Sequence, residues 1–227
     1  MRRIAIIPAR GGSKRIAKKN IKDFLGKPII AYSIETALRS ELFDLVFVST
    51  DDAAIAEVSK SYGAKVPFFR SDKNSDDFAT LADVIDEVLN TFSDKGQVFD
   101  VGCCILPTAP LISHDHLKQG LNLLSASGAD STRPMSQFKY PIQRAFKMDG
   151  KGSLSMFYPE YTKTRSQDLE DAFHDAGQFY WFNSDVGLRG KNKVGYPISQ
   201  IYIQDIDDEE DWKIAEFKYA YLENMST

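Results

Sequence analysis

An apolar run that ends in a glycine pair constrains the fold of this chain most strongly. Residues 4–8 are apolar throughout, and Gly11 and Gly12 follow shortly after. This pattern predicts a buried strand that opens into a tight loop. Five cations lie within ten residues here: Arg10, Lys14, Arg15, Lys18 and Lys19. Because a glycine loop lets an anion approach the backbone closely, the stretch is predicted to bind phosphate.

Other interpretations of this basic loop are weaker. A run of lysine and arginine is by itself most often a solvated surface. The loop is neither a P-loop nor the dinucleotide fingerprint, because G-x-x-x-x-G-K-[ST] and G-x-G-x-x-G are both absent. Its place directly after a buried strand favours phosphate binding, since ligands of open α/β sheets lie at the carboxyl ends of strands. The net charge of -4 argues against a nucleic-acid binder and favours a small anionic ligand.

The length and the cysteine usage bound the class of protein. The 227 residues suffice for one α/β domain with an excursion. Cys103 and Cys104 are adjacent on a predicted strand and point to opposite faces, so we expect both to be reduced, as in a cytoplasmic protein. No apolar run reaches about 18 residues, so no membrane span is expected. The first strand begins at once, so no signal peptide is expected either.

Strands and helices alternate along most of the chain. Strands are predicted at 4–8, 45–50, 66–69, 100–106, 130–135, 179–182 and 199–206. Helices are predicted at 29–39, 53–62, 81–92, 116–125 and 208–222. This order predicts an α/β fold with a Rossmann-like, mostly parallel sheet and helices on both faces. Arg10, Asp51 and Thr108 each follow a predicted strand, so we expect them in one crevice.

The alternation stops at residues 137–175, which are rich in proline, glycine and aromatic residues. This segment is predicted to form hairpins and extended arms that project from the sheet. An aromatic-rich arm without its own core usually covers another surface, often that of a second subunit. We therefore expect one domain over residues 1–227, with residues 137–175 as a dimerisation excursion within it.

Two carboxylates near the C-terminus are candidates for a metal site. Asp205 and Asp207 would point the same way on a strand, with Ile206 directed to the opposite face. Adjacent carboxylates repel unless a cation lies between them, and Mg²⁺ takes one or two carboxylates together with phosphate oxygens. The alternative is that Asp207 caps the following helix. The triphosphate expected at the first loop favours Mg²⁺.

A second group of polar residues interrupts the aromatic strand at 174–180. With Arg165, these residues predict a pocket wall for a polyhydroxylated ligand, although an ordinary amphipathic strand would show the same pattern. His174 is a candidate general base, but a lone histidine is more often structural.

Several segments in order resemble the CMP-sialic acid synthetase family of cytidylyltransferases. They are IPARGGSKRI at 7–16 with Lys19 and Asn20, VSTD at 48–51, PTAPL at 107–111 and DID at 205–207. The resemblance runs the length of the chain. Residues 167–181 resemble the C-terminal signature of those members that act on pseudaminic acid.

The resemblance implies CTP, Mg²⁺ and an acidic nine-carbon sugar as ligands. Nucleotide-binding residues would be Ala9, Arg10, Gly11, Ser13, Lys14, Lys19, Asn20, Arg70 and Thr80. Sugar-binding residues would be Leu106, Thr108, Arg165, His174, Gly177, Gln178 and Tyr180. Asp205 and Asp207 would hold Mg²⁺, and Arg10, Lys14 and Asp207 would be catalytic. The excursion would be a dimerisation arm that reaches into the neighbouring subunit's site.

Leu106 departs from the family pattern, in which a glutamine usually precedes the Pro-Thr motif and contacts the sugar. An apolar side chain here suits a deoxygenated sugar with a methyl group, which pseudaminic acid has at its ninth carbon. The expected activity is transfer of CMP from CTP to the anomeric hydroxyl of such a sugar, with release of pyrophosphate. Other acidic sugars, such as sialic, legionaminic or 3-deoxy-octulosonic acid, and a non-catalytic nucleotide-binding module remain alternatives. The general base is open among a metal-bound hydroxide at Asp207, the sugar carboxylate and His174.

Overall fold

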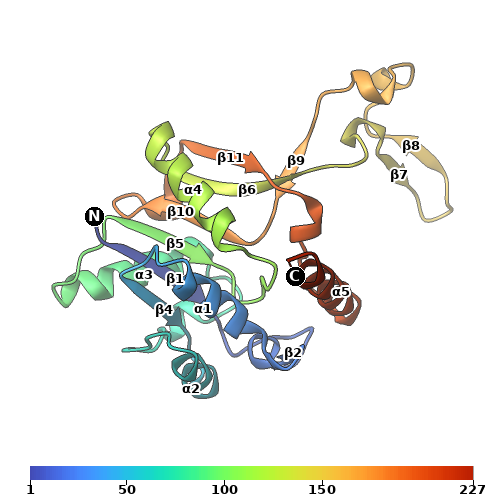
Figure 1. Cartoon of the computed structure of the whole chain (residues 1–227). Coiled ribbons are helices and arrows are strands. Elements are labelled where there is room, and N and C mark those ends of the chain that lie inside the picture. Colours follow the sequence, from blue (N-terminus) through green and yellow to red (C-terminus); the bar gives the residue numbers. More distant parts are fainter. Residues whose placement is uncertain (227) are drawn as a thin grey trace.

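The computed structural model describes residues 1–226 and has a mixed sheet at its centre (Figure 1). Within these residues the strands of this sheet are β1 (Arg3–Pro8), β4 (Leu45–Ser49), β5 (Val101–Ile105), β6 (Ser131–Gln137), β9 (Phe173–Asp175), β10 (Phe179–Asn183) and β11 (Lys193–Pro197). Their order is β11-β6-β10-β5-β1-β4, and β9 pairs with β6. β10 and β9 run opposite to the other five, so the strands are mostly parallel. The predicted Rossmann-like fold class is confirmed.

Helices cover both faces of the sheet. On one face, α1 (Ile29–Arg39), α2 (Ala53–Ser61) and α4 (His114–Ser127) pack against Ile7, Val48 and Cys103. On the other face, α3 (Leu81–Asp94) packs against Ile6, Phe47 and Cys104. The strands are therefore buried on both faces, which explains their continuous apolar sequences.

Local signals set where these helices begin. The Asp52 side chain accepts hydrogen bonds from the backbone N–H groups of Ala54 and Ile55, which caps α2. Thr80 and Asp83 form a reciprocal capping box at the start of α3. Each cap directly follows a residue or segment that contacts the basic loop: Asp51 before α2, and the segment with Asp77 before α3. The caps therefore also fix the position of these contacts.

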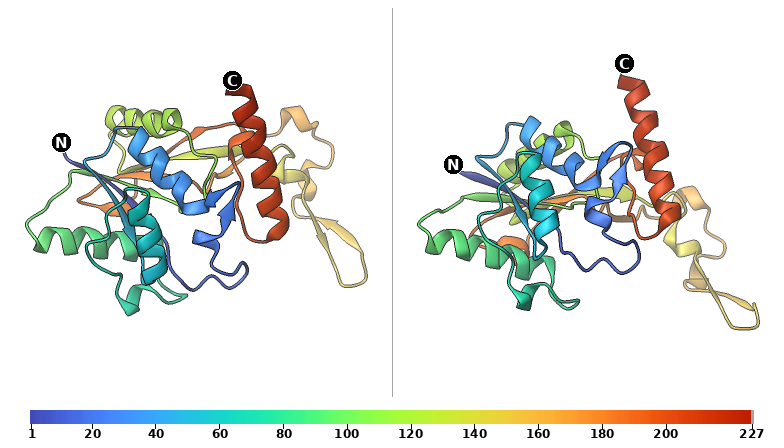
Figure 2. Two further views of the ribbon diagram at one scale, coloured as in Figure 1. Left: turned by 60° about the horizontal axis from the view of Figure 1, so that its bottom comes forward. Right: turned by 90° about the horizontal axis from the view of Figure 1, so that it is seen from below.

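A third apolar cluster joins the two ends of the chain. The small hairpin of β2 (Asp23–Phe24) and β3 (Lys27–Pro28) packs on α5 (Glu209–Ser226). Phe24 and Trp212 meet edge to face with ring centroids 5.6 Å apart. Ile16 of the basic loop and Ile206 lie in the same cluster. In both views of Figure 2, α5 lies between the body and the projecting arm.

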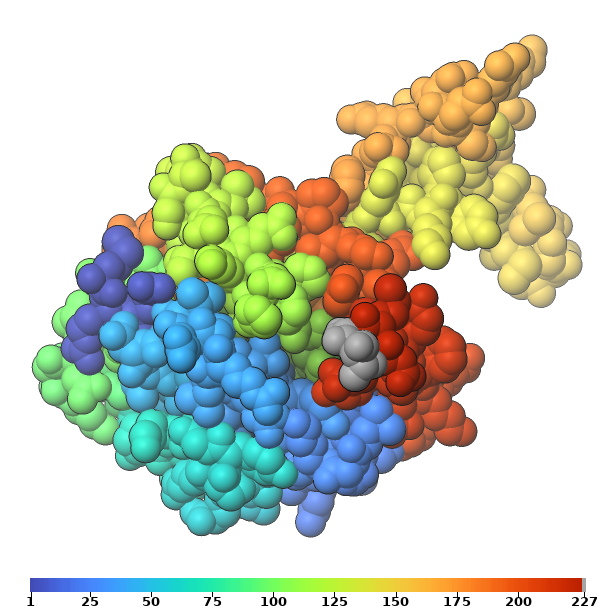
Figure 3. All heavy atoms as spheres, viewed as in Figure 1, coloured from blue at the N-terminus to red at the C-terminus, as the bar shows by residue number. Residues whose placement is uncertain are grey.

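The segment 137–175 leaves the body as an arm (Figures 1 and 3). Its tip is an antiparallel hairpin of β7 (Phe146–Met148) and β8 (Leu154–Met156). Short 3-10 turns complete the chain at Lys19–Ile21, Asp72–Asn74, Ile142–Arg144, Pro159–Tyr161, Ser166–Asp168, Gly187–Arg189 and Gln200–Tyr202. The projecting hairpin agrees with the sequence-based expectation, whereas its role in dimerisation stays a prediction.

Two predicted strands are wrong. Residues 66–69 form no strand, and only an isolated bridge between Lys65 and Phe47 is present there. Pro67 has no N–H group to continue such a ladder. Residues 199–206 form a 3-10 turn followed by irregular chain, and the edge strand is β11, six residues earlier. β11 takes that place because it pairs in parallel with β6 from Lys193 to Pro197.

Cys103 and Cys104 are buried free thiols, as predicted. Across residues 1–226, no helix is both long and apolar enough to cross a membrane.

Candidate active site

The basic loop is anchored at both ends where it leaves β1. The backbone N–H of Ala9 donates to the Ser49 carbonyl at 2.9 Å, beside the end of β4. The Asn20 side-chain amide donates to the Arg10 carbonyl at 2.9 Å. The Gly11 N–H donates to the Asp51 carboxylate at 2.8 Å. The segments that carry Arg10 and Asp51 thus meet at the carboxyl ends of β1 and β4. Thr108, which was expected in the same crevice, follows β5, the neighbour of β1 on its other side.

Gly11 is required where the loop passes the start of α2. A Cβ atom at this position would lie 2.8 Å from the Asp52 carboxylate oxygen Oδ2. Asp52 cannot move away easily, because the same carboxylate caps α2. A residue without a side chain therefore allows the loop to lie against the helix N-terminus.

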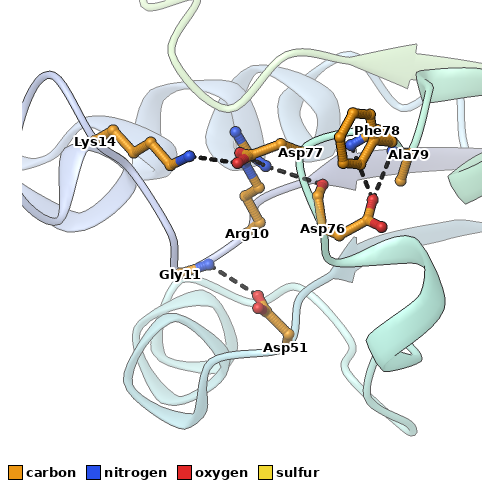
Figure 4. A network of polar contacts seen from close by, with 8 residues as sticks. All are labelled: Arg10, Gly11, Lys14, Asp51, Asp76, Asp77, Phe78 and Ala79. Carbon is orange, nitrogen blue, oxygen red and sulfur yellow. Dashed lines mark hydrogen bonds and ion pairs between the residues drawn. The ribbon is translucent and has the colours of Figure 1, made fainter.

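Two of the predicted phosphate ligands point at one carboxylate (Figure 4). Arg10 Nη1 lies 2.9 Å from Asp77 Oδ1 and 3.0 Å from the Asp76 carbonyl oxygen. The Lys14 ammonium donates to the other oxygen of Asp77. Hydrogen bonds from Lys14 and Arg10 hold the pKa of Asp77 below its usual value. The two cations therefore already converge on an anion, and a phosphate group would have to displace Asp77.

Asp77 was not identified by the sequence analysis. The sequence feature that could have indicated it is the acidic pair at 76–77, shortly before α3. No local pattern, however, predicts that this pair faces the basic loop. It does so because the segment from Asp72 to Thr80 folds back over the end of β1, a contact between residues more than 60 positions apart.

A pocket of about 200 Å³ lies beside this network. It is lined by Pro8, Arg10, Arg70, Asn74, Asp76, Asp77, Ala79, Thr80, Leu81 and Val84. Its volume is below the usual ~300–1,000 Å³ of small-molecule sites, so it accommodates only part of a nucleotide. Arg10, Arg70 and Thr80, which the sequence predicts as nucleotide ligands, share this pocket. A larger cavity of about 880 Å³ lies at the root of the arm, and its lining includes none of these three residues.

Arg70 and Thr80 have structural partners of their own. Arg70 is almost fully buried and donates to the Ser49 hydroxyl at 3.0 Å and to the Ser49 carbonyl. Burial lowers the pKa of Arg70, while the nearby Asp51 carboxylate opposes that shift. The Thr80 hydroxyl belongs to the capping box of α3. Ser13 lies half-buried in the turn of the loop, where its N–H donates to the Gly11 carbonyl.

The C-terminal carboxylates lie against the basic loop. Arg15 Nη2 is 2.6 Å from Asp207 Oδ1, and Lys19 Nζ donates to the Ile206 carbonyl at 2.7 Å. Partial burial lowers the pKa of Lys19, and the carboxylates of Asp207 and Asp205 oppose that shift. Residues almost two hundred positions apart are therefore neighbours.

Burial alternates around Ile206, although the backbone there is not a strand, and the shared metal site of Asp205 and Asp207 stays a prediction. Ile206 is fully buried, Asp205 is exposed and Asp207 is half-buried. Asp207 does not cap the following helix: Asp208 does, since it accepts from the N–H groups of Glu210 and Asp211 at 2.9 Å each. The Asp207 side chain is therefore left to its contact with Arg15.

Asp205 and Asp207 offer fewer ligands than a metal ion held by protein alone would need. Among residues 1–226, no group of three His, Cys, Asp or Glu residues could hold an ion. Magnesium binds through one or two carboxylates and completes its shell with substrate phosphates and water. The Asp207 carboxylate is paired with the positive charge of Arg15, and a bound metal ion would supply a positive charge in its place.

Some of the residues predicted to bind the sugar lie on neighbouring strands. The Leu106 N–H donates to the Gln178 carbonyl at 2.8 Å, and Tyr180 pairs with Cys104 in the β5–β10 ladder. Leu106 is half-buried against both faces of the core, and Thr108 follows it half-buried. The Gln178 side-chain amide donates to the Tyr202 carbonyl. These residues meet at the carboxyl end of β5.

The remaining predicted sugar ligands lie toward the arm. His174 is on β9 at the root of the arm, where its ring lies 4.9 Å from that of Phe138. Gly177 has a φ of +61° and connects β9 to β10. Arg165 is exposed on the arm itself, so it is not brought to the basic loop of its own chain.

Comparison with known proteins identifies the family. The cytidylyltransferase family model matches residues 4–197. A pseudaminic acid cytidylyltransferase of Campylobacter jejuni is 42% identical over 225 residues, which cover 96% of this chain and 97% of that protein. N-acylneuraminate cytidylyltransferase A of Danio rerio is 34% identical over 217 residues, covering 93% of this chain and 49% of that protein.

A solved structure shows the same fold. CMP:2-keto-3-deoxy-manno-octonic acid synthetase complexed with CTP superposes with a TM-score of 0.72 at 15% identity, covering 97% of this chain and 99% of that chain. At this identity the likeness concerns the fold alone. The family match over most of the chain and the near-full-length identity to the Campylobacter enzyme show that this chain belongs to the cytidylyltransferase family.

Proposed function

We propose that the chain transfers CMP from CTP to pseudaminic acid and releases pyrophosphate. The 42% identity to the Campylobacter enzyme over nearly the whole of both chains carries this choice of sugar. The apolar Leu106 at the carboxyl end of β5 supports it, because a methyl group of the sugar would need an apolar neighbour there.

The basic loop would hold the triphosphate. Arg10 and Lys14 already converge on the Asp77 carboxylate, and phosphate oxygens would replace that carboxylate between the same two cations. Donors that are positioned before the reaction stabilise charge that develops on the phosphoryl oxygens. The anomeric hydroxyl of the sugar attacks the α-phosphorus and gives its proton to a base, for which the sugar carboxylate and His174 are candidates. The bond between the α-phosphorus and the oxygen that bridges to the β-phosphate breaks. The electron pair of that bond leaves with pyrophosphate.

Asp205 and Asp207 would hold Mg²⁺ together with phosphate oxygens. The metal, when bound, would neutralise charge on the triphosphate. Arg15 would then release Asp207 and become available to the phosphates, since its partner's charge would be compensated by the ion. The nearby Lys19, which is tied to the Ile206 carbonyl, keeps the loop against this pair.

The sugar would lie at the carboxyl end of β5. Leu106, Thr108, Gln178 and Tyr180 are proposed to line this end, with Gly177 and His174 toward the arm. Arg165 would act on the sugar of a neighbouring subunit, because it lies on the projecting arm.

We further propose a cytoplasmic homodimer that forms through the arm. The arm carries many exposed apolar side chains, among them Tyr140, Phe146, Met148 and Leu154, which are between 55% and 86% exposed. Apolar surface of this kind on a soluble protein marks a contact with another molecule.

The experiment is an assay of pyrophosphate release from CTP and Mg²⁺ with a panel of acidic sugars, in which products are identified by mass spectrometry. We expect CMP-pseudaminic acid as the preferred product. Preferred turnover of N-acetylneuraminic, legionaminic or 3-deoxy-octulosonic acid would refute the choice of sugar. Binding of CTP without release of pyrophosphate with any sugar would refute the transfer reaction.

A further inference from the structure

We propose that Asp175, held by Arg133, fixes the Tyr180 hydroxyl as a hydrogen-bond acceptor for the sugar. This inference rests on the proposed function and adds two positioning residues to it. The three residues come from three strands: Arg133 from β6, Asp175 from β9 and Tyr180 from β10. We call them the Arg–Asp–Tyr cluster.

The contacts within the cluster use both oxygens of Asp175. Oδ1 accepts from the Tyr180 hydroxyl at 3.2 Å and from the Gly177 N–H at 2.8 Å. Oδ2 accepts from Arg133 Nη1 at 3.1 Å. The Arg133 guanidinium also lies over the Tyr180 ring, 4.8 Å from its centroid. The carboxylate is therefore fixed by a backbone donor and a cation, and the cation is fixed by the ring.

The cluster lies on the face of the sheet that Leu106 also borders. Tyr180 is opposite Cys104 in the ladder, and Tyr180, Cys104 and Leu106 pack in the same apolar cluster against α3. Leu106 follows β5 directly, so the Tyr180 hydroxyl lies near the carboxyl end of the central strands. This is the end at which open α/β sheets bind their ligands.

The direction of the hydrogen bond decides what the cluster can bind. An ionised carboxylate only accepts, so the Tyr180 hydroxyl must give its proton to Asp175. Burial, and then the charge of Asp175, raise the pKa of Tyr180, so the phenol stays protonated. The lone pairs of its oxygen are left to accept from a ligand.

The group that this oxygen recognises must therefore be a donor. A hydroxyl or an acylamino N–H of the sugar fits, whereas a carboxylate or phosphate oxygen does not, since it can only accept. The cluster would thus bind a neutral, hydrogen-bond-donating substituent of the sugar. The sugar's own carboxylate must bind elsewhere. Arg133 and Asp175 form an ion pair, so the cluster attracts no ion by net charge.

The test is a double-mutant cycle on kinetics. Asp175→Asn keeps the size of the side chain, and Tyr180→Phe removes only the hydroxyl. We expect each to raise the KM for the sugar about three- to tenfold, the usual effect of losing one hydrogen bond, with the KM for CTP unchanged. The double variant should match Tyr180→Phe alone, because Asp175 acts through that hydroxyl. Asp185→Asn, an exposed carboxylate on the same chain, is the control and should change neither constant.

Three outcomes would overturn the inference. An unchanged sugar KM in Asp175→Asn would show that the carboxylate does not matter, and multiplicative effects in the double variant would show that Asp175 acts independently. A wild-type protein that neither turns over nor binds any acidic sugar in calorimetry would remove the proposed function and this inference together. With an active wild type, only the inference is at stake. Thermal melting of each variant separates loss of the hydrogen bond from loss of the fold.

Discussion

Asp77 occupies the position between Arg10 and Lys14 that a phosphate group is proposed to take. Its carboxylate is half-exposed and accepts from both cations. An acid in this position competes with CTP for the same two donors. It also keeps the side chains of the loop directed toward one point before the nucleotide arrives.

Asp77→Asn should therefore strengthen CTP binding. We expect a dissociation constant a few-fold lower by calorimetry, because exposed ion pairs are individually weak. Asp72→Asn, an exposed acid on the same segment, should leave the constant unchanged. Weaker binding by the Asp77 variant would mean that this side chain itself contacts the nucleotide.

Arg10→Ala should slow the reaction more than it weakens binding. By analogy with the removal of one donor to a developing oxyanion, we expect kcat to fall by about 10²–10³. Steady-state kinetics with CTP as the varied substrate measures this split. A rise in the KM for CTP with kcat unchanged would mean that Arg10 binds the ground state and the transition state equally.

At the scale of single residues, the sequence predicts which side chains can bind a ligand better than it predicts which side chains contact one another. Arg10, Lys14 and the pair Asp205 and Asp207 stand out locally because charges follow an apolar strand or flank a buried residue. Asp77 and Arg133 do not stand out. Their partners lie 63 to 67 and 42 positions away, so their pairing depends on the folded chain.

At the scale of elements, β5 is a central strand of the sheet, because β1 pairs with one of its edges and β10 with the other. Gly102 is the second residue of β5 and lies opposite Phe182. A Cβ atom on Gly102 would lie 2.3 Å from Phe182 Cζ. Only glycine leaves room for that ring against the strand.

Gly102→Ala should lower the free energy of unfolding by about 1–3 kcal/mol, the usual cost of overpacking a core. Urea denaturation measures the change. Gly150→Ala is the matched control, since a Cβ atom there would meet nothing within 4 Å. Equal denaturation midpoints for the two variants would contradict the packing described for β5.

Apolar runs and helical periodicity predict the strands and helices that are buried in the core. For these elements the prediction agrees with the structure. They fail at the sheet edge. Residues 199–206 and 193–197 both carry strand-forming side chains, and only pairing with β6 selects the second.

At the scale of the molecule, the apolar surface of the arm is not covered by the rest of the chain. Phe146 and Leu154 lie on its hairpin and are 55% and 64% exposed. In Figure 3 the hairpin stands clear of the body. In the proposed homodimer, Arg165 on the same arm would act at the active site of the partner.

Replacing both Phe146 and Leu154 by serine should convert a dimer to a monomer without unfolding the body, since neither residue belongs to its core. Analytical ultracentrifugation measures the change, and activity should fall with it. Val98→Ser is the control, because Val98 is 64% exposed on the body. A wild-type protein that is monomeric at micromolar concentration would contradict the proposed role of the arm.

The central claim is that the two ends of the chain serve one magnesium-triphosphate. The contacts of Arg15 with Asp207 and of Lys19 with Ile206 bring those ends together. The direct measurement is pyrophosphate release by Asp207→Asn as magnesium is varied. We predict a loss on the order of a hundredfold, because a bound metal contributes several kcal/mol of charge stabilisation, and a higher magnesium concentration for half-maximal rate. Near-normal turnover at the same magnesium concentration, with unchanged circular dichroism, would contradict the claim.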